Sequence, residues 1–564
     1  MKIKMNALKN AAAYVRFNCK CAFAACIAVM AALLAFGVGG SHSGGSGAAA
    51  SQKAKNVLMI QTDHELFYKH GTDEDVFKIK RPVYDQFRSE AVQFANARSI
   101  CPLCSPARRA MLTAVYPQQS GIMTNATAQT PLPVETMYDV LLGNNFSANN
   151  IYFYGKTHYS GDKMPDDNPV KTYGVQGWAE DGYGQPYTTQ RYAQYLRDNN
   201  YFGAPSGLRN GPVMILEADS LSPGGSPYKG ETFKLADMGI ITGNQFGIAV
   251  TPKEYHEAYF LADLASSGLR RIASRSSRDP FVMSVNIWGP HHPYYPTPEY
   301  ADLYRDADGV LGGDIPEYPT FYDDYYNKPA VYAWDNQVQS GANPGMPAPN
   351  TRAWEDFRAY MALAYAQATM VDDAIGGILD TLKETGLDED TVVIWTNDHG
   401  DALGSHGGHS DKECYLTEEI LAVNMTMRHP DFPELKGTAN AAYVTTVDVP
   451  VTILDVVGMK FNNPDVSGIS LAGLLSGAQK PRDYLTVVTN GHYSDTRARG
   501  LYYDGYIYSY YMDDIDELYD LKNDPFEKDN LIFEPSAQGR VALMKTMLRE
   551  WQVRYKDNIP LVNL

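Results

Sequence analysis

Four short apolar runs, each followed at once by a polar cluster, constrain the fold of this chain most strongly. The runs are Val57–Gln61, Ile151–Tyr154, Phe281–Ile287 and Thr391–Thr396. The clusters that follow them are Thr62-Asp63-His64, Gly155-Lys156-Thr157-His158, Pro290-His291-His292-Pro293 and Asn397-Asp398-His399-Gly400. Short runs that are apolar throughout are typical of strands buried on both faces of a parallel sheet.

Helical segments between these runs favour an α/β fold. Apolar residues recur at helical spacing from Trp354 to Thr385, and Gly386 closes that segment. Strands that alternate with helices predict a large, mostly parallel (mixed) sheet flanked by helices. Ligands bind beyond the carboxyl ends of the strands in such sheets, so we expect the four polar clusters to meet at one rim.

The pattern changes near residue 480. Leu485–Thr489, Gly500–Tyr503 and Tyr506–Tyr511 alternate like antiparallel strands, and Gln538–Tyr555 is typical of a closing helix. We therefore predict a main α/β domain over residues 51–475 and a smaller C-terminal α+β subdomain, with an antiparallel sheet, over residues 476–564. Two Gly-, Pro- and Tyr-rich stretches, 165–240 and 293–350, are expected to be surface insertions that shape a binding site.

The first 50 residues indicate an export signal. Basic residues precede an apolar run from Ala22 to Val38, and a Gly/Ser-rich linker leads to Ala48-Ala49-Ala50, an A-x-A cleavage site. We expect the protein to be exported to the periplasm, the cell surface or the medium, and to meet a membrane only through this segment. An uncleaved anchor remains an alternative, because the apolar run is at the short limit for a bilayer span.

Charge limits the partners of the protein. The formal net charge is -18, which disfavours nucleic acid and anionic membranes. An anionic substrate would therefore require a site that is locally basic.

Three cysteines lie outside the leader, namely Cys101, Cys104 and Cys414. The number is odd, so at least one thiol cannot belong to an intramolecular disulfide. Cys101-Pro102-Leu103-Cys104 is a C-x-x-C sequence, and both a redox pair and a structural disulfide are alternatives for it.

The residues that follow Cys104 carry a more specific signal. Cys104-Ser105-Pro106-Ala107-Arg108 resembles the signature of the formylglycine-dependent (type I) sulfatases, in the alkaline-phosphatase-like superfamily. The resemblance extends from residue 56 to about residue 530 through the four polar clusters and Glu517–Leu521. It implies a sulfuric ester hydrolase that cleaves an aryl or carbohydrate sulfate monoester, of a small molecule or a glycan. It also implies that a maturation enzyme converts Cys104 to formylglycine.

The family resemblance assigns roles to single residues. It implies that one divalent cation is held by Asp63, Cys104, Asp398 and His399. It implies catalytic roles for Cys104, Arg108, Lys156, His158, His291 and Lys412. Of these, Arg108 orients the nucleophile and the two lysines bind sulfate. His158 assists sulfate elimination, and His291 protonates the leaving oxygen.

The chain departs from the commonest family pattern at two ligand positions. His64 and His399 stand where many members have Asp and Asn, and His399 recurs in the choline-sulfatase-like and phosphonate-hydrolase-like branches. A softer ligand set moves the preference from calcium towards manganese. We expect calcium, with manganese or magnesium as alternatives, and leave the role of His64 open.

Two other functions compete with sulfate hydrolysis. A phosphonate monoester or phosphodiester hydrolase could use the same aldehyde, and Asp398-His399 fits both reactions. An inactive binding protein on the same fold is the other, and the complete basic set argues against it. His406 and His409 are candidates for a substrate loop or simply for loop positions.

Overall fold

The computed structural model describes residues 55–66, 77–125, 130–160, 168–180, 186, 189–199, 215–217, 232–234, 247–249, 252–334, 353–412, 414–492 and 494–564. The predicted export signal, residues 1–50, lies outside the described residues. No helix in the described part combines the length and apolar character that a membrane span requires.

A large mixed sheet forms the centre of the fold. Within the described residues it has eight strands in the order β11-β2-β10-β9-β1-β8-β3-β4. Their bounds are β1 Asn56–Asp63, β2 Val92–Arg98, β3 Ile151–Lys156, β4 Gln176–Glu180, β8 Val282–Pro290, β9 Thr391–Asn397, β10 Met425–Arg428 and β11 Thr438–Thr445. Only β10 runs antiparallel to its neighbours, β9 and β2. The mostly parallel sheet predicted from the sequence is confirmed.

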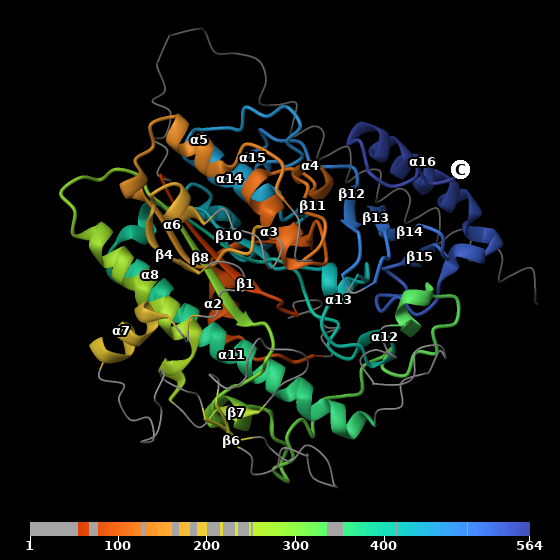
Figure 1. Cartoon of the computed structure of the whole chain (residues 1–564), viewed down its shortest axis with the longest axis horizontal. Helices are drawn as coiled ribbons and strands as arrows, with labels where there is room; N and C mark the ends of the chain where they lie inside the picture. The colour runs from red at the N-terminus through yellow and green to blue at the C-terminus, as the bar shows by residue number, and fades with distance from the viewer. Residues whose placement is uncertain are drawn as a thin grey trace, which may run out of the picture. The chain divides into compact units, whose positions relative to one another are not determined.

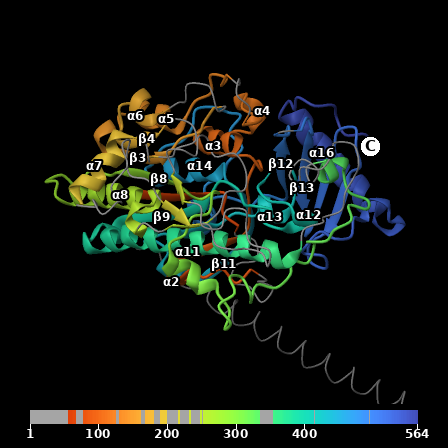
Figure 2. The same ribbon diagram turned by 60° about the horizontal axis from the view of Figure 1, so that its bottom comes forward.

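Helices cover both faces of the main sheet, because its central strands are apolar on both sides. In β1, Leu58 and Ile60 enter one core cluster, while Val57 and Met59 enter the other. The first cluster includes residues of α2 (Pro82–Ser89), α8 (Glu257–Ala273) and α11 (Trp354–Glu384). The second includes residues of α3 (Cys104–Thr113), α5 (Met137–Gly143), α14 (Asp448–Val456) and α15 (Leu471–Ser476). Figures 1 and 2 show the sheet between these two helical layers.

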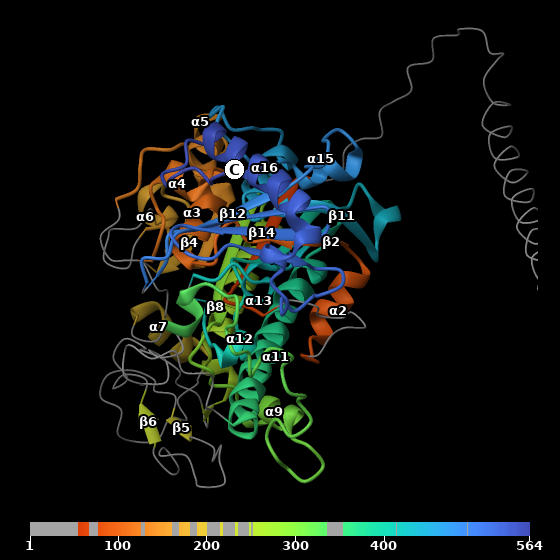
Figure 3. The same ribbon diagram turned by 90° about the vertical axis from the view of Figure 1, so that its right-hand side faces the viewer.

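An antiparallel sheet follows the main one in the sequence. It has the order β12 (Leu485–Thr489), β13 (Ala498–Tyr503), β14 (Tyr506–Tyr511), β15 (Glu517–Asp520), and α16 (Gln538–Arg554) packs beside it (Figure 3). Leu103 and Ala110, at the start and in the middle of α3, share one core cluster with Val488 and Trp551. The antiparallel sheet therefore supports the helix that begins at Cys104. The domain boundary at residue 476 stays a prediction.

One segment differs from its prediction. The stretch 165–240, expected to be a surface insertion, contains β4, which pairs in parallel with β3 and extends the main sheet. The strand was missed because it lies at the edge of the sheet and its sequence, Gln-Gly-Trp-Ala-Glu, has no apolar run. The same stretch contributes two strands, β5 (Ile215–Glu217) and β6 (Thr232–Lys234), to a small sheet completed by β7 (Ile248–Ala249).

Candidate active site

The four polar clusters predicted to converge do lie at one rim of the sheet. Strands β9, β1, β8 and β3 are consecutive neighbours and mutually parallel, so their carboxyl ends meet at the same edge. Asp63 is the last residue of β1 and Lys156 the last of β3, while Asp398 and His291 directly follow β9 and β8. All four side chains are buried.

Cys104 lies at the centre of this rim. It is the first residue of α3, a helix buried along its whole length, and its own side chain is fully buried. Its Sγ lies 3.0 Å from His399 Nε2 and 3.9 Å from Asp63 Oδ1. The N-terminus of α3 directs backbone N–H groups and positive potential towards the same rim, which favours an anion there.

The other two cysteines do not pair with Cys104. The structure has Cys101, Cys104 and Cys414 as free, buried thiols. The disulfide alternative for the C-x-x-C sequence is therefore wrong. Burial raises the pKa of the Cys101 thiol to about 12, which leaves it protonated and unreactive.

Arg108 lies one helical turn after Cys104 and connects α3 to two strand ends. Its Nη2 is 2.6 Å from Asp63 Oδ2 and its Nε is 2.7 Å from Asp398 Oδ2. Its Nη1 donates to the carbonyl oxygen of Lys156 at 3.3 Å. A guanidinium with three aligned donors can fix both carboxylates at once, which an ammonium group could not do.

A second cation shares the Asp63 carboxylate. Lys156 Nζ lies 2.7 Å from Asp63 Oδ2, and both side chains are fully buried. Burial opposes ionisation of Asp63, but Lys156 and Arg108 together hold the pKa of this carboxyl well below its ordinary value. Asp63 is therefore an anion in the folded protein.

The predicted ligand set is assembled in the structure. Candidate ligand atoms of Asp63, Cys104, Asp398 and His399 all lie within 4.8 Å of one another, and all four residues are buried. His399 Nδ1 donates to the Gly400 carbonyl oxygen at 2.9 Å, so the Nε2 lone pair faces Cys104. Burial lowers the pKa of His399, which keeps this imidazole neutral. Two carboxyl groups with one neutral imidazole are a donor set that fits a divalent cation.

His291 and Lys412 form the opposite wall of the site. His291 Nδ1 donates to the His292 carbonyl oxygen at 2.7 Å, and its Nε2 lies 3.4 Å from Lys412 Nζ and 4.0 Å from Asp63 Oδ1. Burial lowers the pKa of His291 well below its ordinary value, and His292 and Lys412 add to this effect. Of the two adjacent histidines, His291 is thus the one that faces Asp63 and Lys412.

His158 is the sixth residue of the predicted catalytic set. It is fully buried two residues beyond the end of β3, in the left-handed backbone conformation at φ 52. Such a conformation is uncommon for a residue other than glycine and is often associated with functional sites.

His64 contacts two of the four ligand candidates and also reaches a second group of residues. Its backbone N–H donates to Asp398 Oδ1 at 3.1 Å, and its ring centroid lies 5.1 Å from that of His399. Its Nε2 lies 3.3 Å from Asp401 Oδ2 and 3.3 Å from Asp411 Oδ1, and its ring meets that of His291 edge-on at 4.5 Å. Tyr294 donates to the same Asp401 carboxylate at 2.5 Å. Neither Asp401 nor Asp411 was predicted from the sequence, although each stands beside a predicted motif.

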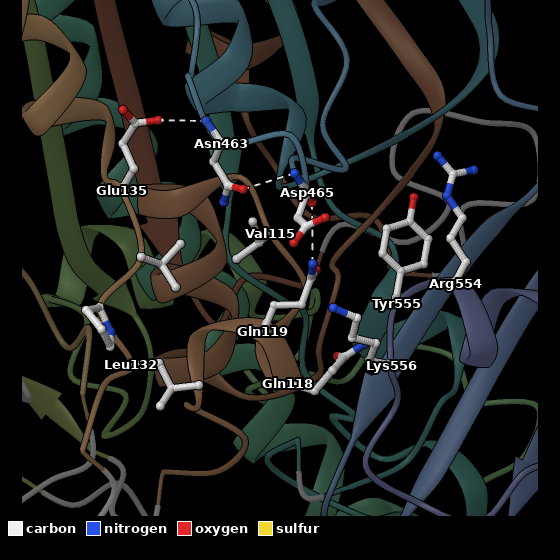
Figure 4. A pocket seen from close by; sticks show the side chains of 12 residues that line it. Val115, Gln118, Gln119, Leu132, Glu135, Asn463, Asp465, Arg554, Tyr555 and Lys556 are labelled. Carbon is white, nitrogen blue, oxygen red and sulfur yellow. Dashed lines mark hydrogen bonds between the residues drawn. The ribbon is translucent and has the colours of Figure 1, made fainter.

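A pocket at the far end of α3 is separate from this site. It has a volume of about 430 Å³ and is lined by residues such as Gln118, Glu135, Asp465 and Tyr555 (Figure 4). None of the predicted site residues lines it. The chemistry of the chain is therefore to be sought at the strand ends and not in this pocket.

The fold and the site define a class of protein. Around the strand ends of an α/β sheet, the site gathers a buried thiol, two buried carboxylates and three basic side chains, an arrangement that could hold an anionic ester. Residues 55–459 match the family model "Sulfatase", and residues 404–554 match the model "N-sulphoglucosamine sulphohydrolase, C-terminal". The first match covers more than half of the 564 residues, so the chain belongs to the sulfatase family of sulfuric ester hydrolases.

Relatives with known names are distant but matched over most of their length. The ulvan-active sulfatase of Formosa agariphila is 23% identical over 496 residues, with 86% of this chain and 78% of that protein covered. The Delta 4,5-hexuronate-2-O-sulfatase of Bacteroides thetaiotaomicron is 24% identical over 527 residues, with 91% of each chain covered.

Solved structures agree on the fold. A 2-O GAG sulfatase superposes with a TM-score of 0.62 at 20% identity, covering 90% of this chain and 93% of the other. The phosphonate monoester hydrolase of Agrobacterium radiobacter superposes with a TM-score of 0.66 at 18% identity, covering 89% and 96%. At these identities the superpositions establish the fold alone.

Proposed function

We propose that this protein hydrolyses a sulfate monoester of a carbohydrate, with residue 104 in its formylglycine form and one bound divalent cation. The observation that carries the proposal is the position of Cys104. Its side chain lies against His399 and Asp63, and Arg108 lies one turn further along the same helix. Three cationic side chains, Arg108, Lys156 and Lys412, supply the local positive charge that an acidic protein needs to hold a sulfate ester.

The cation would be held by Asp63, Asp398, His399 and the modified residue 104. When bound, it would neutralise sulfate oxygens and lower the pKa of the attacking hydroxyl. Calcium is our expectation, and manganese and magnesium are alternatives. Manganese gains weight because His399 makes the ligand set softer than one built from oxygen donors only.

The hydrate of formylglycine supplies a hydroxyl for attack at sulfur and a second hydroxyl through which sulfate is later expelled. Around it, Arg108 and Lys156 keep Asp63 ionised and fixed in place. Lys412, whose Nζ lies 3.4 Å from His291 Nε2, would bind a sulfate oxygen, and His291 would give a proton to the leaving alcohol. The imidazole of His291 is neutral in the free protein, and a sulfate ester next to Nε2 would favour its protonated form.

We favour a carbohydrate sulfate over an aryl sulfate as the substrate because of the names of the matched relatives. Two of the proteins matched over most of their length are named for activity on ulvan and on a hexuronate 2-O-sulfate, while a third is named a choline-sulfatase. We also propose that residues 1–50 direct export, which would place the enzyme where sulfated polysaccharides are found.

A phosphonate monoester hydrolase is the second candidate function. The fold does not separate it from the first candidate, because the phosphonate monoester hydrolase of Agrobacterium radiobacter and the 2-O GAG sulfatase both superpose on this chain. The same formylglycine nucleophile and the same Asp398-His399 pair would serve phosphorus, at which more negative charge must be neutralised.

A matched pair of substrates separates the two functions. Protein co-expressed with a formylglycine-installing enzyme would be assayed with an aryl sulfate and the corresponding aryl phosphonate monoester, and then with a panel of sulfated mono- and disaccharides. We expect the sulfates to be hydrolysed faster, and Cys104→Ala to remove activity on both. Faster turnover of the phosphonate would contradict the proposal and leave the second candidate.

A further inference from the structure

A second buried cluster of metal-ligand residues lies outside the active site. It is formed by His406, Glu419 and Glu527, whose candidate ligand atoms all lie within 4.8 Å of one another. His406 belongs to α12 (Ser405–Gly408), Glu419 to α13 (Glu418–Leu421), and Glu527 to the loop after β15. The three side chains are at most 1% exposed. Three separate segments of the chain thus bring two carboxylates and one imidazole into a dry interior.

Each of the three side chains directs an unbonded atom into the cluster. Among the described residues, no hydrogen bond reaches His406 Nε2, Glu419 Oε2 or Glu527 Oε1. The other oxygen of each carboxylate is bonded, since Glu419 Oε1 accepts from Tyr318 and Glu527 Oε2 accepts from the Glu418 N–H at 2.8 Å. Buried polar atoms are rarely left unpaired, because each one loses its hydrogen bonds to water without gaining others.

The spacing matches that of ligands on one metal ion. His406 Nε2 lies 3.4 Å from Glu419 Oε2, which is too long for a good hydrogen bond. Two ligand atoms at ~2.1 Å from a tetrahedral zinc ion lie ~3.4 Å apart. Asp323 Oδ2 lies 3.7 Å from the other imidazole nitrogen, Nδ1, on the side where zinc-binding histidines meet a carboxylate.

Backbone geometry agrees with this interpretation. His406 adopts φ 44 and ψ 56 inside α12, a left-handed conformation that is uncommon for a residue other than glycine and is often associated with functional sites.

We propose that His406, Glu419 and Glu527 bind a structural divalent ion of the Zn²⁺ type, distinct from the cation of the active site. Three protein ligands, one of them an imidazole, suit a four-coordinate zinc ion better than calcium, which takes about 6–8 oxygen ligands. The ion joins the loop between His399 and Lys412 to α13 and to the segment beyond the antiparallel sheet. It thereby fixes the loop on which Lys412 is carried, without touching the reacting groups.

Metal counting tests the site with two matched variants. Glu527→Gln removes one ligand charge and keeps the side-chain shape, whereas the double variant Asp63→Asn, Asp398→Asn disables the active-site cation. After dialysis against Zn²⁺ and removal of free ion, we expect the wild type to carry one more zinc than Glu527→Gln. The double variant should keep the zinc that Glu527→Gln loses. Equal zinc content in the wild type and Glu527→Gln would overturn the proposal and leave a protonated carboxyl pair.

A second measurement covers the case in which Glu527→Gln does not fold. The double variant at Asp63 and Asp398 lacks two ligands of the active-site cation, and adding His291→Gln removes one ligand of the buried group His64, His291 and His292. A response of the melting temperature of this triple variant to Zn²⁺ after chelation reports on the second cluster. We expect a rise in melting temperature that saturates at one equivalent of Zn²⁺. A melting temperature unchanged by Zn²⁺ would overturn the proposal.

Discussion

Arg108 and Asp63 form an ion pair in which both side chains are at most 1% exposed and Nη2 lies 2.6 Å from Oδ2. The pair links the helix that begins with Cys104 to the end of strand β1. Because the same guanidinium also bonds Asp398, it sets the spacing of both carboxylates relative to residue 104. The arginine is therefore as much a part of the cation site as the residues that would contact the ion.

Replacement of this arginine should reduce activity far more than stability. Arg108→Lys keeps the charge but can reach only one of the two carboxylates, so we expect kcat/KM to fall by ~10²–10³. The control is Arg109→Lys, since Arg109 is also buried but donates to the Leu132 carbonyl oxygen at 3.4 Å. Steady-state kinetics with melting temperatures distinguish the two. Equal losses of activity in both variants would show that Arg108 has no special role.

Maturation of Cys104 should decide whether the enzyme is active. Protein made without a formylglycine-installing enzyme should fold with normal melting temperature, carry a free thiol at residue 104 and have little activity. Intact-mass and peptide mass spectrometry would measure the modification in parallel with activity. Cys101→Ala serves as the control, because Cys101 is equally buried but lies outside the cation group. Full activity of unmodified protein would rule out the mechanism.

Removal of the active-site cation should abolish hydrolysis reversibly. After dialysis against a chelator we expect activity at background level, restored by Ca²⁺ or Mn²⁺. Asp398→Asn should raise the cation concentration needed for half-maximal activity, because the carboxylate also bonds Arg108 and the His399 backbone N–H. Glu527→Gln should need the same Ca²⁺ concentration as the wild type. Activity that survives chelation would exclude a cation from the reaction.

Gly155 allows β3 to approach β8 directly before Lys156. It adopts φ 99, and a Cβ atom added there would lie 2.0 Å from the Asn286 carbonyl oxygen. Gly155→Ala should therefore push the two strands apart, lower the free energy of unfolding by more than about 2 kcal/mol and displace Lys156 from Asp63. The control is Gly143→Ala at the end of α5, where the added Cβ meets nothing within 4 Å. Denaturation curves and kcat report the two effects.

The strands that could be predicted from the sequence are those that are fully buried. β1, β3, β8 and β9 were found because they are buried throughout and rich in apolar residues, and their ends identified the site. β11 was missed because only two of its eight residues are fully buried, and β4 because it is a short edge strand. Fully buried strands leave a signal in composition that partly exposed ones do not.

Within the site, the sequence predicted only those residues that stand in a short, continuous sequence motif. Asp411 was missed because its role depends on the approach of His64, 347 positions earlier in the chain, to 3.3 Å. The cluster of His406, Glu419 and Glu527 was likewise invisible, since three separate segments contribute one residue each. Contacts of this kind arise from the tertiary fold and have no local spacing to recognise.

The stability of the protein should depend on pH through Asp372. This buried carboxyl of α11 accepts the backbone N–H groups of Val83 and Tyr84 at 2.8 and 2.9 Å, at the start of α2. Burial raises its pKa from 3.8 to about 7, against the opposing effect of those two hydrogen bonds. Between these values the folded state binds the extra proton, so the contribution of Asp372 to stability is complete below pH 4 and declines as pH rises towards 7.

Asp372→Asn resembles the protonated carboxyl and does not titrate. The free energy of unfolding of this variant, relative to that of the wild type, should therefore increase between pH 5 and pH 8. The gain is at most about 4 kcal/mol, the equivalent of a shift of about three pKa units. The neighbouring Asp373 is the control, because its pKa is shifted in the opposite direction. Although partial burial acts against it, Lys253 at 2.7 Å lowers the pKa of Asp373, whose contribution is therefore lost as pH falls. Parallel pH profiles for wild type and Asp372→Asn in urea denaturation would show that Asp372 is ionised in the folded protein throughout this range.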